Sequence, residues 1–188
     1  MDGGSGVSRL FAFGLGFSAQ TLTERLARKG WQIAGTARDV GKIGQLAARG
    51  YEIAQYSGEA GNSALPPALL GTTHLLHSIP PGPESDPVLE HYREELAKLS
   101  SLEWIGYLST VGVYGDQEGR WVDETIAPRP NSARTEARVE AEQAWLEFGA
   151  ETGVPVQIFR LAGIYGPGRS VFDKLRTGTA RRVKKDGQ

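Results

Sequence analysis

Residues 9–38 read RLFAFGLGFSAQTLTERLARKGWQIAGTAR, and this stretch decides the fold class of the chain. Its pattern predicts, in chain order, a short apolar strand (9–13), a glycine turn (14–19), an amphipathic helix (20–29) and a second strand (31–37). Leu22, Leu26 and Ala27 lie on one face of this helix, which we expect to be its buried face. A glycine pattern indicates dinucleotide binding when it lies in a particular context. That context is a strand, a G-x-G-x-x-A turn, a helix and a second strand within about thirty residues.

The glycine turn has the residue types that a phosphate-binding turn needs. Gly14 permits a tight turn, Gly16 lets a pyrophosphate approach the backbone, and Ala19 is small enough for the helix to pack closely on the strand. The N-terminus of the helix would present unpaired N–H groups and a positive dipole end to the phosphates. The alternative is a βαβ unit in which these glycines serve packing alone. The residues expected to contact the nucleotide here are Gly14, Gly16, Phe17 and Ser18.

The end of the second strand indicates which cofactor is preferred. An NAD site usually carries Asp or Glu there to bind the ribose 2′-hydroxyl, whereas this chain has Thr36, Ala37 and Arg38. Arg38 can pair bidentately with a 2′-phosphate, and Thr36 would add a hydroxyl. We therefore expect NADP, with NAD as the alternative because Asp39 follows directly. The other interpretation of Arg38 is a solvated arginine at a strand end.

The composition excludes several classes of protein. The chain has 188 residues, a net charge of −1 and no cysteine, which rules out disulfides, thiol catalysis and cysteine-ligated metals. Its three histidines (His74, His77 and His91) lack metal-ligand spacing, so we expect no metal. We find no signal-peptide pattern and no apolar stretch long enough for a membrane span, and we expect a soluble cytoplasmic protein.

The chain reads as one main domain with two short flanks. Residues 1–7 are expected to be a disordered leader, and residues 8–170 an NAD(P)-binding domain. Residues 171–188 form a basic segment, with six basic residues and one acidic residue after position 173. No aromatic residues are interleaved with these charges to stack on bases, so nucleic-acid binding is not favoured.

Further along the chain, strands and helices alternate, which predicts an α/β fold with a doubly wound parallel sheet. THLLHSI (73–79) is apolar almost throughout, as expected for a buried parallel strand, and the prolines that follow must turn the chain. Ser78 and Ile79 lie at the carboxyl end of this strand, where such sheets bind ligands, so we expect both to flank the cofactor ribose. The other expected elements are strands at 51–56, 102–108 and 154–160 and helices at 40–49, 87–99 and 132–148.

Four segments together resemble the extended short-chain dehydrogenase/reductase superfamily, the group of NAD-dependent epimerases and dehydratases. They are GLGFSA (14–19), LSTVGVYG (108–115), the helix from residue 132 and FRLAGIYGPG (159–168), and the resemblance covers about residues 8–170. It implies an NAD(P)-binding Rossmann fold. It also implies hydride transfer on a small carbonyl, alcohol or nucleotide-sugar substrate, and a homodimer formed through helix 132–148.

The resemblance also assigns catalytic positions, and here the chain departs from the family. Thr110 matches the family residue that binds the substrate oxygen. The family then has Tyr-x-x-x-Lys on the next helix, but the matching positions here are Arg134 and Arg138. Arginine does not deprotonate in proteins, so Arg134 is a poor general acid, whereas Arg138 would still hold the nicotinamide ribose. Tyr114 and Tyr165 lie in Tyr-Gly turns that the family uses structurally.

Two functions therefore remain open from the sequence. The first is an atypical member of the superfamily that still transfers hydride. The alternative is a non-catalytic sensor or scaffold that binds NADP(H) without the Tyr-Lys pair. Family members continue for roughly a hundred residues into a small substrate lobe, so we expect that lobe to be largely absent from this sequence.

Overall fold

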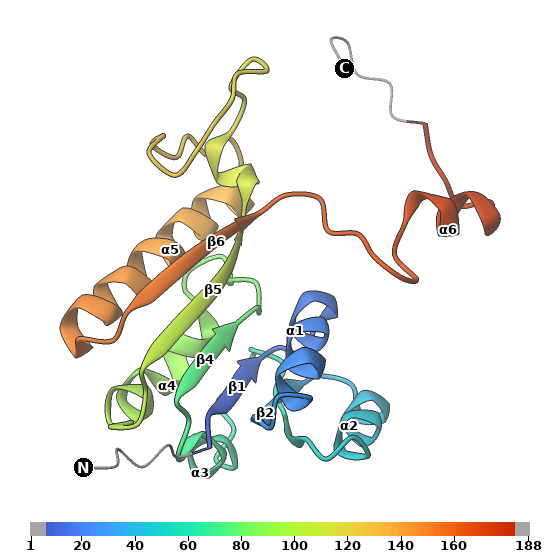
Figure 1. The fold of residues 1–188 in the computed structure, drawn as a ribbon. Coiled ribbons are helices and arrows are strands. Elements are labelled where there is room, and N and C mark those ends of the chain that lie inside the picture. The colour runs from blue at the N-terminus through green and yellow to red at the C-terminus, as the bar shows by residue number, and fades with distance from the viewer. Residues whose placement is uncertain (1–6, 183–188) are drawn as a thin grey trace.

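A computed structural model describes residues 7–182 and confirms the α/β, doubly wound parallel sheet (Figure 1). Within these residues, six parallel strands pair in the order β3-β2-β1-β4-β5-β6. The strands are β1 (Arg9–Phe13), β2 (Gln32–Ala37), β3 (Glu52–Gln55), β4 (His74–His77), β5 (Trp104–Thr110) and β6 (Val156–Leu161). Most of the expected leader (1–7) and the last six residues of the basic segment lie outside the described residues.

Helices connect the strands close to where the pattern predicts them. Figure 1 shows α1 and α2 grouped near β1 and β2, and α5 lying along β5 and β6, while α6 lies apart from the sheet. A 3-10 turn, η1 (Val111–Tyr114), follows β5 directly. The helices are α1 (Phe17–Ala27), α2 (Val40–Ala47), α3 (Leu65–Leu69), α4 (Pro87–Ala97), α5 (Ala133–Thr152) and α6 (Val171–Arg176).

Two helix boundaries differ from the expected ones by three residues or more. Helix α1 begins at Phe17 rather than Gln20, because Gly14 (φ 84°) and the extended Gly16 complete the turn within three residues. Helix α5 continues beyond Phe148 and ends at Gly153, whose left-handed conformation (φ 75°) stops it. Its start at Ser132 was predicted, and the Ser132 hydroxyl caps it by accepting from the N–H of Thr135.

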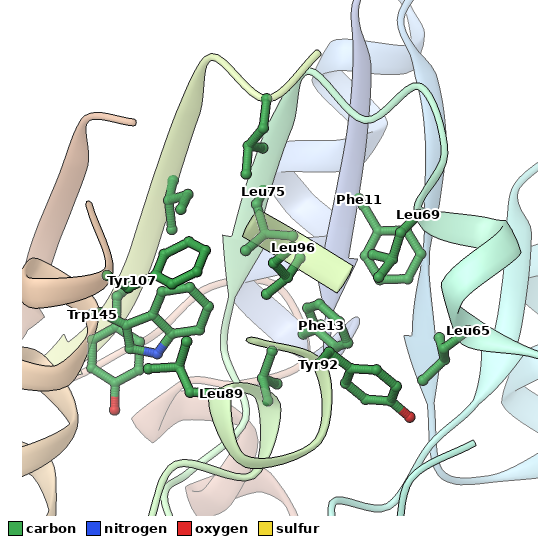
Figure 2. Close-up of a cluster of buried hydrophobic side chains, with 14 of the residues drawn as sticks. Phe11, Phe13, Leu65, Leu69, Leu75, Leu89, Tyr92, Leu96, Tyr107 and Trp145 are labelled. Carbon is green, nitrogen blue, oxygen red and sulfur yellow. The ribbon is translucent and has the colours of Figure 1, made fainter. Parts of the chain in front are cut away.

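The sheet separates two apolar cores. Alternate residues of β1 point to opposite faces: Phe11 and Phe13 join the core under α3, α4 and α5, and Leu10 and Ala12 join the core under α1 and α2. Figure 2 shows the larger core, in which Trp145 of α5 is fully buried beside Tyr107 and Leu89. Burial on both faces explains why the inner strands read as near-continuous apolar runs.

One expected core residue lies at the surface. Leu22 was placed on the buried face of α1, but its side chain is 36% exposed, whereas Thr23 is fully buried. The smaller core ends beside β4, and next to it Leu22, Leu108 and Phe159 line an open apolar groove of about 560 Å³ over β5 and β6. Periodicity alone misassigned Leu22 because no described helix packs on this part of the sheet.

The strand order reverses between β1 and β4, which pair directly although about sixty residues separate them. In open α/β sheets, ligands bind at the carboxyl ends of the strands beside such a reversal. None of the helices within residues 7–182 is both long and apolar enough to cross a bilayer.

Candidate functional site

A cavity of about 420 Å³, called here the first cavity, opens at the carboxyl ends of β1, β2 and β4. The glycine turn forms one wall, Arg38 and Lys42 another, and Ser78 and Ile79 a third. Seven of the eight residues predicted to contact the nucleotide border this cavity or the second cavity described below, and Thr36 is the exception. The cavity lies beside the reversal of strand order, as predicted from the topology.

The glycine turn is held by a residue from β2. The backbone N–H of Gly14 donates to Thr36 Oγ1 over 2.9 Å, and the N–H of Leu15 donates to the carbonyl oxygen of Thr36 over 2.9 Å. Thr36 has no exposed surface. The expected contact of Thr36 with a 2′-phosphate is therefore corrected. Strand β2 lies beside β1 and places the Thr36 hydroxyl against the Gly14 backbone, where it stabilises the glycine turn.

Ser78, the residue after β4, also holds the glycine turn in place. Its hydroxyl donates to the carbonyl oxygen of Gly14. A Cβ on Gly14 would lie 2.9 Å from Ser78 Oγ and 3.0 Å from a side-chain carbon of Ile79, and Gly14 also has φ of 84°. Glycine is thus required at position 14 for packing and for backbone conformation. Ser78 and Ile79 line the first cavity.

Gly16 differs from Gly14, because a Cβ at position 16 would meet no atom within 4 Å. Its φ is −74°, which any residue can adopt, so the fold itself does not demand glycine here. Gly16 borders both cavities and is the N-cap of α1, and no side chain caps this eleven-residue helix. An open backbone beside uncapped N–H groups fits the pyrophosphate of a dinucleotide.

The β2 end of the first cavity carries two basic side chains. Arg38 is exposed there, and Lys42 on the first turn of α2 joins it. Asp39 is occupied as the cap of α2, since its carboxylate accepts from the N–H of Lys42 over 2.8 Å. Sequence reasoning missed Lys42. Its position three residues after a capping aspartate, at the start of the helix that follows β2, was the available signal.

A second cavity, of about 260 Å³, lies between the start of α1 and the carboxyl end of β5. Phe17, Ser18, Thr110 and Arg138 all border it, so the structure brings together residues that the sequence separates by about 120 positions. Thr110 Oγ1 accepts from the N–H of Gly112 over 3.1 Å. Its hydroxyl proton has no acceptor within residues 7–182 and is free to donate into the cavity.

Arg138 is anchored at the end of β5. One terminal nitrogen donates to Tyr107 Oη and to the carbonyl oxygen of Leu108, each over 3.1 Å. Burial raises the pKa of Tyr107, and the nearby Arg138 guanidinium only partly offsets this, so the phenol stays protonated and accepts from Arg138. The remaining N–H groups of Arg138 have no acceptor within the described residues.

A buried ionic network sets the register of α5 against the sheet. Glu142 is 3% exposed and accepts from Ser109 Oγ over 2.5 Å and from Arg160 of β6 over 2.8 Å. Arg160 also donates to Tyr114 Oη over 2.9 Å. Tyr114 is thus held in a structural contact, and neither it nor Tyr165 borders the first or second cavity. Since Glu142 is fixed, Arg138 one turn earlier faces the second cavity.

No group of three or more histidines or carboxylates within residues 7–182 is arranged to hold a metal ion. Two histidines are instead in structural contacts: His77 Nε2 lies 2.7 Å from a carboxylate oxygen of Asp86, and His91 Nδ1 lies 2.8 Å from Tyr56 Oη. His74 contacts the hydroxyl of Thr73.

Comparison with known proteins agrees with this geometry. The model of the NAD dependent epimerase/dehydratase family matches residues 88–186. Protein YeeZ of Escherichia coli strain K12 is 30% identical over 166 residues, which cover 83% of this chain and 58% of YeeZ. The chain therefore spans little more than half the length of this relative.

Two solved structures extend the comparison. A functionally unknown conserved protein from Silicibacter pomeroyi DSS is 43% identical, with a TM-score of 0.84 over 97% of this chain and 62% of that one. The UDP-glucuronic acid 4-epimerase of Bacillus cereus, solved with UDP-glucuronic acid and NAD, is 17% identical, with a TM-score of 0.65 over 81% of this chain and 55% of the epimerase. At that identity the epimerase supports the fold alone.

Proposed function

The chain belongs to the NAD-dependent epimerase/dehydratase family, and from this premise we propose that it binds NADP(H) along the first and second cavities. The open backbone at Gly16 carries this proposal, because the fold leaves room for a side chain there and an approaching pyrophosphate would need that room. The uncapped N-terminus of α1 would hold the pyrophosphate. Ser78 and Ile79 would flank a ribose, as their place in the cavity wall suggests.

The preference for NADP over NAD rests on charge at the end of β2. Arg38 and Lys42 offer two cations to a 2′-phosphate. Asp39, the residue that would favour NAD, has its carboxylate engaged as the cap of α2. A carboxylate that already accepts a backbone hydrogen bond is a weaker acceptor for a ribose hydroxyl. NADP is therefore the cofactor that these side chains favour.

The substitution Arg38→Asp is expected to reverse this preference. NADPH affinity should fall roughly 10- to 100-fold, because a charge-assisted contact is lost and a like charge faces the phosphate, while NADH affinity is retained or rises. Fluorescence titration with each cofactor measures both. Arg25→Asp, at an exposed position of α1 outside both cavities, is the control and should leave both affinities unchanged. An unaltered preference in Arg38→Asp would refute this role for Arg38.

We propose that the bound cofactor serves hydride transfer to or from a small carbonyl or alcohol. The nicotinamide would supply the hydride chemistry. Thr110 would donate a hydrogen bond from its hydroxyl to the substrate oxygen, and Arg138, anchored by Leu108 and Tyr107, would hold the nicotinamide ribose. An oxygen that accepts the hydroxyl hydrogen bond of Thr110 gains negative charge more easily, which favours hydride arrival at its carbon.

A non-catalytic NADP(H)-binding protein is the second candidate, and one observation favours it. The two positions that carry the acid and its helper in the family are both arginines here, and neither gives up a proton at neutral pH. Titration with NADPH followed by cofactor oxidation against a panel of carbonyl compounds separates the two candidates. Oxidation supports the enzyme, whereas tight binding without oxidation supports the sensor or scaffold, and absence of binding refutes both.

A further inference from the structure

A third cavity, of about 370 Å³, continues the row formed by the first two. The first and second cavities share Gly16 and Ser78, and the second and third share Arg134 and Arg138. An extended dinucleotide laid along the carboxyl edge of the sheet would occupy the first two. The third is then the space left for a substrate that reaches Thr110.

The third cavity is lined by cations without any anion. Its walls are the proline-rich loop 80–83 after β4 and four residues of α5, namely Ala133, Arg134, Ala137 and Arg138. No aspartate or glutamate contributes to this lining or to that of the second cavity. Two positive charges among proline and alanine, with little polar competition, favour an anion.

Arg134 has no structural task that explains it. Within residues 7–182 its side chain makes neither a hydrogen bond nor an ion pair, unlike Arg160 and Arg9, whose guanidinium groups pair with Glu142 and Glu52. It lies on the first turn of α5, where the helix dipole disfavours a positive charge. It is also four residues before Arg138, and like charges at this spacing repel. Both penalties disappear when an anion binds between the two guanidinium groups.

We propose that the third cavity binds an anionic group of the substrate, a carboxylate or a phosphate, and that Arg134 is its principal ligand. The substrate class is then a small oxo or hydroxy compound with an anionic end: its reacting oxygen lies at Thr110 and its anion between loop 80–83 and α5. The assignment of the anion to a substrate rests on the proposed binding of NADP(H) in the first two cavities. Planar guanidinium groups suit either anion, because both present paired oxygens.

The test is isothermal titration of the NADPH-saturated protein with malonate, with inorganic phosphate and with malonamide, which is malonate without its charges. NADPH occupies the α1 N-terminus in this experiment, so the anions cannot report on that site. We expect at least one anion to bind at millimolar concentration and malonamide not to bind. The tighter of the two anions indicates whether the substrate carries a carboxylate or a phosphate.

Arg134→Gln keeps the length and helix propensity of the side chain but removes its charge. It should weaken anion binding to the NADPH-saturated protein roughly tenfold or more, and it should weaken NADPH binding less, because Arg134 borders only the second of the two cavities assigned to NADPH. Arg28→Gln is the matched control, because Arg28 is exposed at the other end of α1, away from all three cavities, and it should change neither affinity. The anion affinity should also decrease as salt is raised.

Two results would overturn the proposal. One is that neither anion binds in preference to malonamide, and the other is that Arg134→Gln binds the anions as well as the unaltered protein does. If NADPH itself does not bind, the proposed function fails separately. The same titrations are then made on the cofactor-free protein. If the third cavity is an anion site, Arg134→Gln must weaken anion binding there too, and unchanged anion binding would again overturn the proposal.

Discussion

Replacing Gly16 with valine is expected to reduce NADPH affinity about 100-fold or more, which corresponds to roughly 3 kcal/mol of binding free energy. The Cβ of the new side chain would enter open space at the border of the two cavities, where the pyrophosphate must approach the backbone. The fold should tolerate the change, because φ at this position is −74° and no atom lies within 4 Å. Only the modest cost of a poor helix cap, about 1 kcal/mol, is expected in the free energy of unfolding.

Fluorescence titration with NADPH and urea unfolding measure these two effects separately. Gly44→Val is the control, because a Cβ at Gly44 also meets nothing within 4 Å, and Gly44 lies on α2 outside both cavities. The control should bind NADPH normally. Normal NADPH binding by Gly16→Val would mean that the glycine turn is not the phosphate site, and the proposed function would then lose its main support.

The substitution Asp86→Ala is expected to cause the largest loss of stability, about 3 to 5 kcal/mol in the free energy of unfolding. The Asp86 carboxylate lies 2.7 Å from His77 Nε2, and both side chains are almost completely buried, at 1% and 0% exposure. Asp86 also caps α4 by accepting from the N–H groups of Val88 and Leu89. Its removal leaves a polar ring nitrogen of His77 without a partner inside the larger core, where water cannot replace the lost contact.

Asp39→Ala separates the two contributions of Asp86. Asp39 caps α2 through a single hydrogen bond and is exposed, so its loss should cost only about 1 kcal/mol, the usual value for a cap. Urea unfolding at pH 7 compares the two variants. Equal losses would show that the buried contact with His77 contributes little beyond capping.

The pH dependence of stability tests the same pair. Burial raises the pKa of Asp86, but the Coulombic attraction and hydrogen bond of His77 outweigh burial and bring the pKa below its usual value. A carboxyl with a lowered folded-state pKa contributes stability above its unfolded pKa of ~3.9, and this stability is lost as pH falls through the folded-state value. The stability difference between the unaltered protein and Asp86→Asn should therefore shrink as pH falls below about pH 4. A difference that grows below about pH 4 would contradict the lowered pKa of Asp86.

The sequence by itself determined the fold class, the order of the strands and helices, and the position of the glycine turn. These features depend on short-range patterns: apolar runs for inner strands, a spacing of three or four residues for helix faces, and glycine where the backbone must turn. Gly14 and Gly16 were recognised together for this reason. The sequence did not show that the fold requires glycine at position 14 but not at position 16. Gly14 is constrained by Ser78, which lies 64 positions away, whereas Gly16 borders empty space.

Only the tertiary structure decided which side chains line the cavities. Thr36 looked like a phosphate ligand in the sequence, but strand pairing turns its hydroxyl toward the Gly14 N–H, and Leu22 is exposed because no described helix covers β5 and β6 beside it. Lys42 and Arg134 become candidate ligands through contacts between elements that are distant in the chain. Local sequence does not specify which side of a helix or strand faces another element, because that choice is made by packing of the whole domain.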